Sequence, residues 1–383
     1  MKSKKIEVSA YYFPNFHSDV RNEQWHGKGW NEWELVKSAK PRFEGHDQPK
    51  IPLWGYEDES DPKVMAKKIK VASESGIDNF IFDWYWYEDG PFLERALNEG
   101  FLKAKNCSDI HFSLMWANHD WTDIHPAQRS VWTYGHQTLK YGEVKEQTFI
   151  EATNFMISHY FCQKNYYRIE GGCYVSFYML AGLISGLGGV KETARVLNEF
   201  RKRAKEKGFK LHLNAIIWGE QILPGEKRAC TLEETNDLLE ELGFDSVSSY
   251  VWVHHYFPDI FPRTDYSIYK DICEKLYKKM DSDYRKYYFP NVTMGWDASP
   301  RTVQSDVYDN VGYPWCPVLV NNTPKQFESA LERMKEYLLQ RDGYPMFTIN
   351  AWNEWTEGSY LEPDTKNGYG YLNAIKKVFK EQG

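Results

Sequence analysis

Apolar, β-rich runs alternate with helical patterns along the whole chain of 383 residues. This alternation constrains the fold more than any other feature, because it is typical of βα units and a parallel sheet. Eight runs occur, at 6–13, 77–84, 110–116, 172–177, 210–217, 244–250, 287–294 and 345–350. Helices are expected between them, at 62–75, 92–105, 144–163, 191–207, 232–242, 268–282 and 324–340, and a last one at 371–381.

The connections that follow the strands are long, whereas the joints between helices and strands are short. Asp61-Pro62 and Thr323-Pro324 predict helix starts, and glycines predict helix ends. Eight repeats with enlarged loops predict an α/β fold of the (β/α)8 TIM barrel type, with the active site on the C-terminal face. A doubly wound sheet is the alternative, but it normally has a Gly-rich turn where this chain has Phe13-Pro14-Asn15-Phe16. No linker divides the chain, so we expect a single domain over 1–383.

Composition excludes several classes of partner and site. The net charge of −7 provides no basic field for nucleic acid. The six cysteines form no C-x-x-C pair, His254-His255 lacks a third ligand, and neither a metal nor another cofactor is expected. No apolar run is long enough to span a membrane, and oligomeric state stays open. The start of the chain has no signal-peptide pattern, which predicts a cytoplasmic protein; a periplasmic or secreted one is the alternative if a leader was removed.

Aromatic residues make up 16% of the chain, and many of them stand beside acidic, amide and imidazole side chains at the predicted strand ends. Aromatic rings stack on the C–H faces of sugars while carboxylates and amides bind hydroxyls. The alternatives are aromatic core packing, a loop-holding role for the pair His119 and Asp120, and structural ion pairs at Asp83 and Asp297. The predicted carbohydrate-binding residues are Tyr12, His17, Trp30, Asp83, Trp84, Trp116, Asn118, His119, Asp120, Trp121, Tyr250, Trp252, Trp296, Asp297, Asn353 and Trp355.

Glu354 and Glu357 follow the last predicted strand, three residues apart and flanked by Trp352 and Trp355. If the segment turns helically, both carboxylates project to one side. Two carboxylates in one cleft are typical of acid/base work on a glycosidic bond, and we predict that this pair is catalytic. A solvated surface pair is the alternative, and the spacing does not choose between a retaining and an inverting reaction.

Seven motifs, in order along nearly the whole chain, resemble the WbsX-like family. They are Tyr11-Tyr12-Phe13-Pro14-Asn15-Phe16-His17, Trp25-His26-Gly27-Lys28-Gly29-Trp30-Asn31-Glu32-Trp33, Gly45-His46-Asp47-Gln48-Pro49, Gly76-Ile77-Asp78-Asn79-Phe80, Trp116-Ala117-Asn118-His119-Asp120-Trp121, Gly295-Trp296-Asp297-Ala298-Ser299-Pro300-Arg301 and the segment from Ala351 to Pro363. Such proteins are similar to glycoside hydrolase family 99, the endo-α-mannosidases and endo-α-mannanases.

That resemblance implies a (β/α)8 barrel and a retaining mechanism in which the 2-hydroxyl of the substrate attacks C1 and forms a 1,2-anhydro sugar. Glu354 would be the base toward this hydroxyl, and Glu357 the general acid and then the base for water. We therefore predict a hydrolase acting on a poly- or oligosaccharide. A glycosyltransferase or transglycosylase in polysaccharide biosynthesis and a non-catalytic carbohydrate-binding protein are the alternatives.

Overall fold

The computed structural model describes residues 5–129 and 135–380, so Glu381, in the last predicted helix, lies outside the described residues. Within them, nine parallel strands form a nearly closed barrel, and the predicted (β/α)8 fold is confirmed. Around the ring, the strands follow the order β12 (Tyr287–Phe289), β10 (Ser246–Ser248), β9 (Lys210–Ile216), β8 (Gly172–Phe177), β4 (His111–Trp116), β2 (Asn79–Tyr87), β1 (Glu7–Tyr12), β15 (Met346–Asn350) and β13 (Asn291–Thr293).

The seventh strand position differs from the prediction of one continuous run at 287–294. Pro290 divides it into β12 and β13, because proline has no backbone N–H to donate to a neighbouring strand. β12 pairs with β10, while β13 pairs with β15. The two short strands therefore share one barrel position, which explains how nine strands make an eightfold barrel.

The helices begin and end largely where the sequence predicts. Asp61 and Thr323 cap α3 (Pro62–Ser75) and α9 (Pro324–Gln340), each accepting a hydrogen bond from a backbone N–H of the first turn. The patterns at 92–105 and 144–163 contain π-helical turns, η1 (Ala96–Phe101) and η4 (Met156–Tyr160), which shorten the α-helical part. The remaining helices are α1 (Val20–His26), α2 (Trp33–Ser38), η2 (Cys107–Asp109), α4 (Glu146–Phe155), α5 (Leu180–Gly186), α6 (Val190–Glu206), α7 (Leu232–Glu241), η5 (Trp252–His254), α8 (Tyr266–Asp283), η6 (Ser299–Thr302), η7 (Trp355–Glu357) and α10 (Gly370–Phe379).

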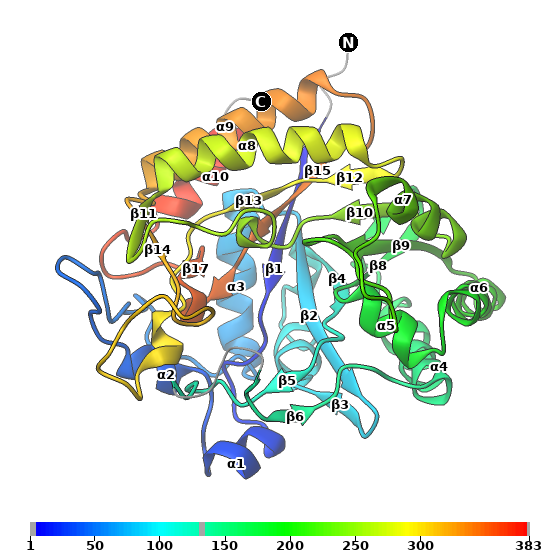
Figure 1. The fold of residues 1–383 in the computed structure, drawn as a ribbon, viewed down its shortest axis with the longest axis horizontal. Helices are drawn as coiled ribbons and strands as arrows, with labels where there is room; N and C mark the ends of the chain where they lie inside the picture. The colour runs from blue at the N-terminus through cyan, green and yellow to red at the C-terminus, as the bar shows by residue number, and fades with distance from the viewer. Residues whose placement is uncertain (1–4, 130–134, 381–383) are drawn as a thin grey trace.

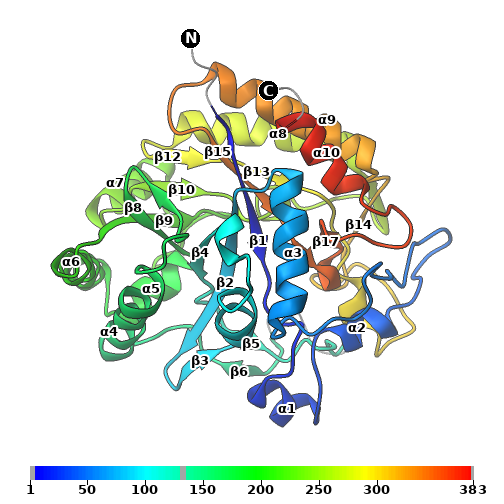
Figure 2. The same ribbon diagram turned by 180° about the vertical axis from the view of Figure 1, so that it is seen from behind.

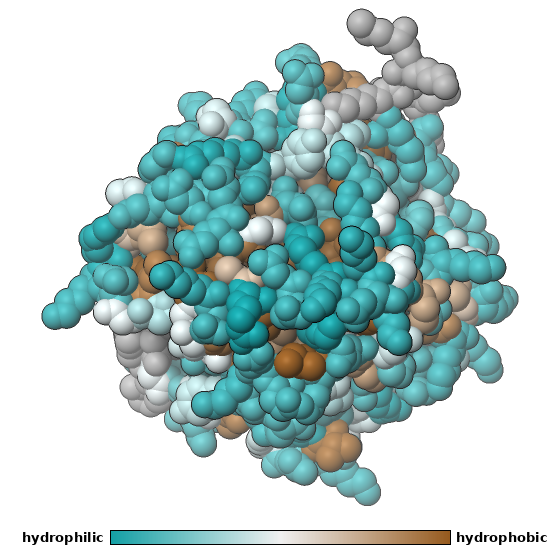
Figure 3. Space-filling view, turned by 90° about the vertical axis from the view of Figure 1, so that its right-hand side faces the viewer, coloured by the Kyte–Doolittle hydropathy of each residue, from teal (hydrophilic) through white to brown (hydrophobic). Residues whose placement is uncertain are grey.

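Helices surround the barrel on its outside. α8, α9 and α10 lie together along one side, and α3 covers β1 from behind in Figure 1 and from the front in Figure 2. The face that carries α4, α5 and α6 is mostly hydrophilic, with small separate apolar patches (Figure 3). Among the described helices, none is both long and apolar enough to cross a membrane.

Side chains alternate strictly between the inside of the barrel and the helix layer. Tyr11 points inward, since its hydroxyl donates to the Ser249 carbonyl of the loop after β10 at 3.2 Å. Its neighbour Tyr12 points outward and donates to the sulfur of Met65 on α3 at 3.1 Å. This two-residue period decides which side chains at each strand end can face the mouth of the barrel.

Short strands outside the ring shape the loops. A hairpin of β5 (Trp121–Thr122) and β6 (Thr138–Lys140) follows β4, and a hairpin of β16 (Asn353–Glu354) and β17 (Ser359–Tyr360) follows β15. The others are β3 (Gly90–Phe92), β7 (Arg168–Ile169), β11 (Arg263–Asp265) and β14 (Val318–Val320).

Candidate active site

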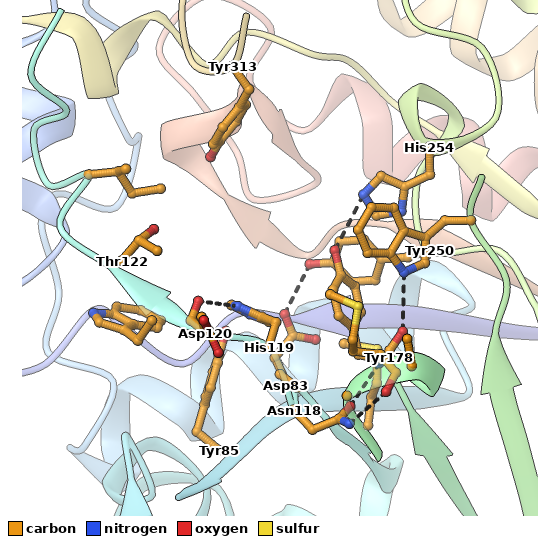
Figure 4. A pocket seen from close by; sticks show the side chains of 18 of the residues that line it. Asp83, Tyr85, Asn118, His119, Asp120, Thr122, Tyr178, Tyr250, His254 and Tyr313 are labelled. Atoms are coloured by element: carbon orange, nitrogen blue, oxygen red, sulfur yellow. Dashed lines mark hydrogen bonds between the residues drawn. The ribbon is translucent and has the colours of Figure 1, made fainter. Parts of the chain in front are cut away.

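A cavity of about 870 Å³ opens at the C-terminal ends of the strands, as the barrel predicts. It is lined by residues that follow seven of the eight strand positions. Tyr313 points into it from the side opposite Asn118, and Tyr250 and His254 lie along a third side (Figure 4). Its volume is large enough for several sugar units.

Glu354 and Glu357 both line this cavity. Glu354 ends β16, and Glu357 ends the single 3-10 turn of η7, which closes on Gly358 in the left-handed conformation with φ of 62°. The turn is anchored from below, because the Trp355 indole stacks on Tyr360 with ring centroids 3.7 Å apart and donates to a Glu362 oxygen at 2.7 Å. The helical turn thus presents both carboxylates to the same space.

Burial raises the pKa of both carboxyls. For Glu354, the pKa lies well above its usual value, first because of burial and then because of the neighbouring charge of Glu357. The pKa of Glu357 is also raised by burial, against the opposing effects of the Arg301 guanidinium and of the Tyr313 hydroxyl, which donates to Glu357 Oε1 at 2.7 Å. Burial and the proximity of the two carboxyls therefore favour a proton on the pair more than on ordinary glutamates.

Arg301 is the positive charge closest to this pair. It is fully buried, lines the cavity, and forms an ion pair with the buried Glu32 at 3.3 Å. Glu32 in turn accepts from Asn15 and Thr356, each at 2.8 Å. Arg301 offsets part of the negative charge that Glu354 and Glu357 would carry when ionised.

Asp83, at an inward position of β2, provides a third carboxyl. Tyr250 donates to its Oδ2 at 3.0 Å, whereas Oδ1 is buried without a hydrogen-bond partner. Burial raises the pKa of Asp83 well above its usual value. Since an unpaired buried polar atom is costly, this oxygen is suited to receive or donate a hydrogen bond when a polar ligand enters.

The polar residues after β4 both line the cavity and hold its loops. Asn118 exchanges two hydrogen bonds of 2.8 Å with the backbone of Met179, and Asp120 accepts from the Gly142 N–H at 2.8 Å. Burial lowers the pKa of the His119 imidazole, which favours its neutral form. The loop-holding alternative considered for His119 and Asp120 therefore describes Asp120, and Asn118 also holds a loop, while all three residues line the cavity.

The structure brings nine of the predicted site residues together. Besides the two glutamates, the cavity lining includes Asp83, Asn118, His119, Asp120, Trp121, Tyr250 and Trp296. The other nine do not line it. They are Tyr12, His17, Trp30, Trp84, Trp116, Trp252, Asp297, Asn353 and Trp355.

Three of these nine occupy outward positions of their strands, so the prediction that they contact substrate is corrected. Tyr12 contacts α3, Trp84 packs against Tyr160, and Trp116 stacks on Phe149 of α4 with ring centroids 5.5 Å apart. The sequence interpretation included the aromatic residue at each of these strand ends, whereas strand alternation places its neighbours, and not the aromatic residue itself, toward the cavity.

Three others support the β16–β17 hairpin and the turn between its strands from behind. Asn353 donates to the Phe13 carbonyl at 2.8 Å, and Trp355 is held by Glu362. Asp297 accepts from His46 at 2.9 Å and from Gln48 at 2.7 Å. Burial acts to raise the pKa of Asp297, but these partners hold it below its usual range.

The last three lie in other packing environments. The Trp252 indole donates to the Asn291 carbonyl at 2.7 Å and stacks near Tyr266 of α8. Trp30 stacks on His26 with ring centroids 4.4 Å apart. His17 is fully buried, and burial lowers its pKa to about 4.

Several cavity residues were missed by the sequence interpretation. Tyr85 lies two residues beyond Asp83 and Tyr178 two beyond Ser176, so strand alternation could have identified both. Trp218, His125, His254, Arg301 and Tyr313 also line the cavity, but they belong to long loops in which no periodicity indicates an orientation.

Comparisons with known proteins agree with the barrel fold. The structure superposes on a GH99 endo-α-mannosidase from Bacteroides thetaiotaomicron with a TM-score of 0.59 and 13% identity, covering 98% of this chain and 96% of the other. It superposes on a glycoside hydrolase-like protein with a TM-score of 0.58 and 14% identity, covering 99% and 96%. These likenesses show a shared barrel fold.

In sequence, the chain is 26% identical to the uncharacterized protein WxcX of Xanthomonas campestris pv. campestris, strain B100, over 386 residues. The alignment covers 96% of this chain and 49% of WxcX, so the chain spans about half the length of the curated relatives it matches. The family described as "Glycosyltransferase WbsX" matches residues 8–375. With a match over nearly its whole length, the chain belongs to the WbsX family.

Proposed function

We propose that this protein is a glycoside hydrolase that cleaves a glycosidic bond in a poly- or oligosaccharide with Glu354 and Glu357. The observation that supports this most is the buried carboxyl pair, in which both pKa values are raised, in one aromatic-walled cavity at the barrel mouth. Carboxyls tuned in this way are suited to donate and accept protons near neutral pH.

In the proposed reaction, Glu354 removes the proton of the sugar 2-hydroxyl, whose oxygen then bonds to C1 as the C1–leaving-group bond breaks. Glu357 donates its proton to the departing oxygen and later accepts one from water. The water oxygen bonds to C1 as the C1–O2 bond of the 1,2-anhydro ring breaks, and Glu354 returns its proton to O2. Arg301 and Tyr313 stabilise the negative charge on the pair. Aromatic faces such as Trp121 lie where a positively charged sugar ring is stabilised.

The proposed order requires Glu354 to be ionised and Glu357 to carry the proton when the substrate binds. Because the pKa values of both carboxyls are raised, either carboxyl can hold that proton. The same residues with exchanged roles, Glu354 as acid and Glu357 as base, are the competing assignment.

Transfer of a sugar to an acceptor is the second candidate, because the family is described as a glycosyltransferase. The cavity wall carries Asp83, Asp120, Glu143 and the catalytic pair, and Arg301 is its one arginine or lysine among the described residues. This wall therefore offers a diphosphate group a single cation, which is already paired with Glu32. A transfer reaction is therefore expected to use a glycoside rather than a nucleotide sugar as donor.

A panel of end-labelled oligosaccharides in H₂¹⁸O, with mass spectrometry of the products, separates these reactions. Hydrolysis incorporates ¹⁸O at the new reducing end, whereas transfer gives longer products without it. Glu354→Gln and Glu357→Gln are expected to lose activity by about 10³-fold or more on natural linkages. The surface variant Glu226→Gln serves as the control and should match the unaltered protein.

Glycosyl fluorides assign the roles, since fluoride leaves without a proton. The variant that lacks the general acid regains turnover on a fluoride, and the variant that lacks the base does not. Recovery by Glu357→Gln supports the proposed order, and recovery by Glu354→Gln reverses it. Hydrolysis of natural linkages at the unaltered rate by either variant would refute the proposal.

A further inference from the structure

One wall of the cavity differs in chemistry from the rest. It consists of Met179, Trp218, Ile222, Pro224, Val253 and Phe257, which we call the apolar arc. These residues follow β8, β9 and β10, three strands that are neighbours in the barrel. The apolar arc is therefore one continuous surface rather than scattered side chains.

Several polar groups on this side bond to one another, while Nδ1 of His254 is buried without a hydrogen-bond partner. The Trp218 indole N–H donates to the Tyr178 carbonyl at 3.3 Å, and the Tyr178 hydroxyl lies 3.3 Å from Nε2 of His254 (Figure 4). Burial lowers the pKa of His254 to about 3, so its ring is neutral at physiological pH. A sugar that rests on this wall finds an aromatic face but few free partners for its hydroxyls.

The neighbouring wall, after β4, has the reverse character, and it meets the apolar arc where Asn118 bonds to the backbone of Met179. Asn118, His119, Asp120 and His125 supply amide, imidazole and carboxylate groups to the cavity. Glu354 and Glu357, after β15, belong to neither wall. A substrate that extends across the cavity thus meets a polar wall with one unit and the apolar arc with another.

Two members of the apolar arc are exposed in the empty cavity, Ile222 by 52% and Phe257 by 42%. Large apolar side chains exposed at the mouth of a cavity are typical of a binding surface that a ligand covers. A fully hydroxylated sugar would cover them at the cost of placing hydroxyls against carbon.

We propose that the sugar unit bound on the apolar arc carries a methyl group at a position where an ordinary hexose has a hydroxyl. A 6-deoxy sugar and an acetylated sugar both supply such a methyl group. The proposal rests on the proposed function, since it assigns a substrate class to the same cavity. Against an apolar wall, a methyl group in place of a hydroxyl is expected to favour binding about 10- to 100-fold.

Binding, measured without turnover, tests this assignment. Saturation-transfer NMR and competition titrations compare matched methyl glycosides: mannose with 6-deoxymannose, galactose with 6-deoxygalactose, and glucose with N-acetylglucosamine. The first two pairs report a deoxy methyl group, and the third reports an acetyl one. Because no bond is cleaved, an absence of hydrolysis would refute the proposed function and leave this test intact.

The expected result is at least tenfold tighter binding of the methyl-bearing member of one or more pairs, with the strongest saturation transfer at its methyl protons. Ile222→Ser and Phe257→Ser should each reduce that preference severalfold. Ile268→Ser is the matched control, because Ile268 lies on α8 and is 59% exposed; this variant should retain the preference for the methyl-bearing sugar.

Equal or tighter binding of the hydroxylated member of every pair would overturn the proposal. A preference that survives both Ile222→Ser and Phe257→Ser would also overturn it, because the methyl group would then bind elsewhere. Tighter binding of geraniol than of every methyl-bearing sugar would show that the apolar arc accepts a lipid chain instead.

Discussion

Replacing Gly358 by alanine should disable the catalytic turn while leaving the barrel folded. Gly358 ends the 3-10 turn with φ of 62°, a conformation that costs an alanine about 1–2 kcal/mol. An added Cβ would also lie 2.6 Å from the Asp297 Cβ and 2.9 Å from its backbone N, whereas ordinary contact begins at 3.4 Å. The two segments must therefore separate by about 0.8 Å.

The structure indicates which segment yields. Asp297 is fixed by His46, Gln48 and the Ser299 N–H, and its own backbone N–H donates to the Glu357 carbonyl at 2.5 Å. The displacement consequently falls on the turn that carries Glu357. A shift of about 1 Å in a catalytic group costs roughly 10²-fold in rate.

Gly368→Ala is the matched control, because Gly368 has a similar φ of 54° and nothing within 4 Å of an added Cβ. In denaturant unfolding, Gly368→Ala should lose about 1–2 kcal/mol of stability, and Gly358→Ala should lose that amount plus about 1–3 kcal/mol for the steric contact. Only Gly358→Ala should lose about 10²-fold in kcat/KM on the oligosaccharide that the unaltered protein cleaves. Activity of Gly358→Ala within threefold of Gly368→Ala would refute the reasoning.

Three further predictions concern buried charges. Lys68 bridges the buried Glu59 and Glu362 at 2.5 Å each, so Lys68→Met should lower the free energy of unfolding by about 3–5 kcal/mol. Lys70→Met, at an exposed position of the same helix, is the control and should change the free energy of unfolding in denaturant by no more than about 0.5 kcal/mol. Tyr313→Phe removes a hydrogen bond that lowers the pKa of Glu357, so the limb of the pH–activity profile that reports Glu357 should move to higher pH. Tyr256→Phe, which removes a hydrogen bond to Asp259, is the control and should leave the profile unmoved. An unmoved profile for Tyr313→Phe would contradict the prediction. Glu354→Gln should stabilise the protein by about 1–2 kcal/mol while abolishing activity. Because the folded-state pKa of Glu354 is raised, stability falls as pH rises above the ordinary value of 4.5; the gain on mutation should therefore be larger at pH 8 than at pH 5, and a larger gain at pH 5 would contradict the direction of the shift.

The barrel could be predicted because its pattern is repeated and local. Six of the eight predicted runs match β1, β2, β4, β8, β9 and β15 closely, and α3 and α9 have the predicted bounds. The differences from the prediction are a divided strand and two π-helical turns, and they have separate causes. Pro290 splits the seventh strand, and the π-helical turns at η1 and η4 depend on packing that no sequence periodicity records.

The sequence predicted at which strand ends the candidate site lies, but not which side chains at those ends face the cavity. Glu354 and Glu357 were found because a short turn beyond β15 brings residues three apart to one side. At β2 the choice between Asp83 and Trp84 needed the inward or outward position of each residue, and the prediction named both. The inward series Asp83 and Tyr85 is fixed once one member is known to face the barrel, so a strict use of alternation would have added Tyr85 and removed Trp84.

Arg301 could not have been identified in this way, because its place depends on contacts between loops that lie far apart in the sequence. It reaches the catalytic pair from the loop after β13, while its partner Glu32 comes from the loop after β1. Asp297 joins the same two loops through His46 and Gln48. The motifs that resemble the family thus contain two kinds of residue, those that face the cavity and those that fix the turn bearing Glu357. Substitution of Asp297 should therefore impair catalysis through the position of that turn, even though its side chain lies outside the cavity wall.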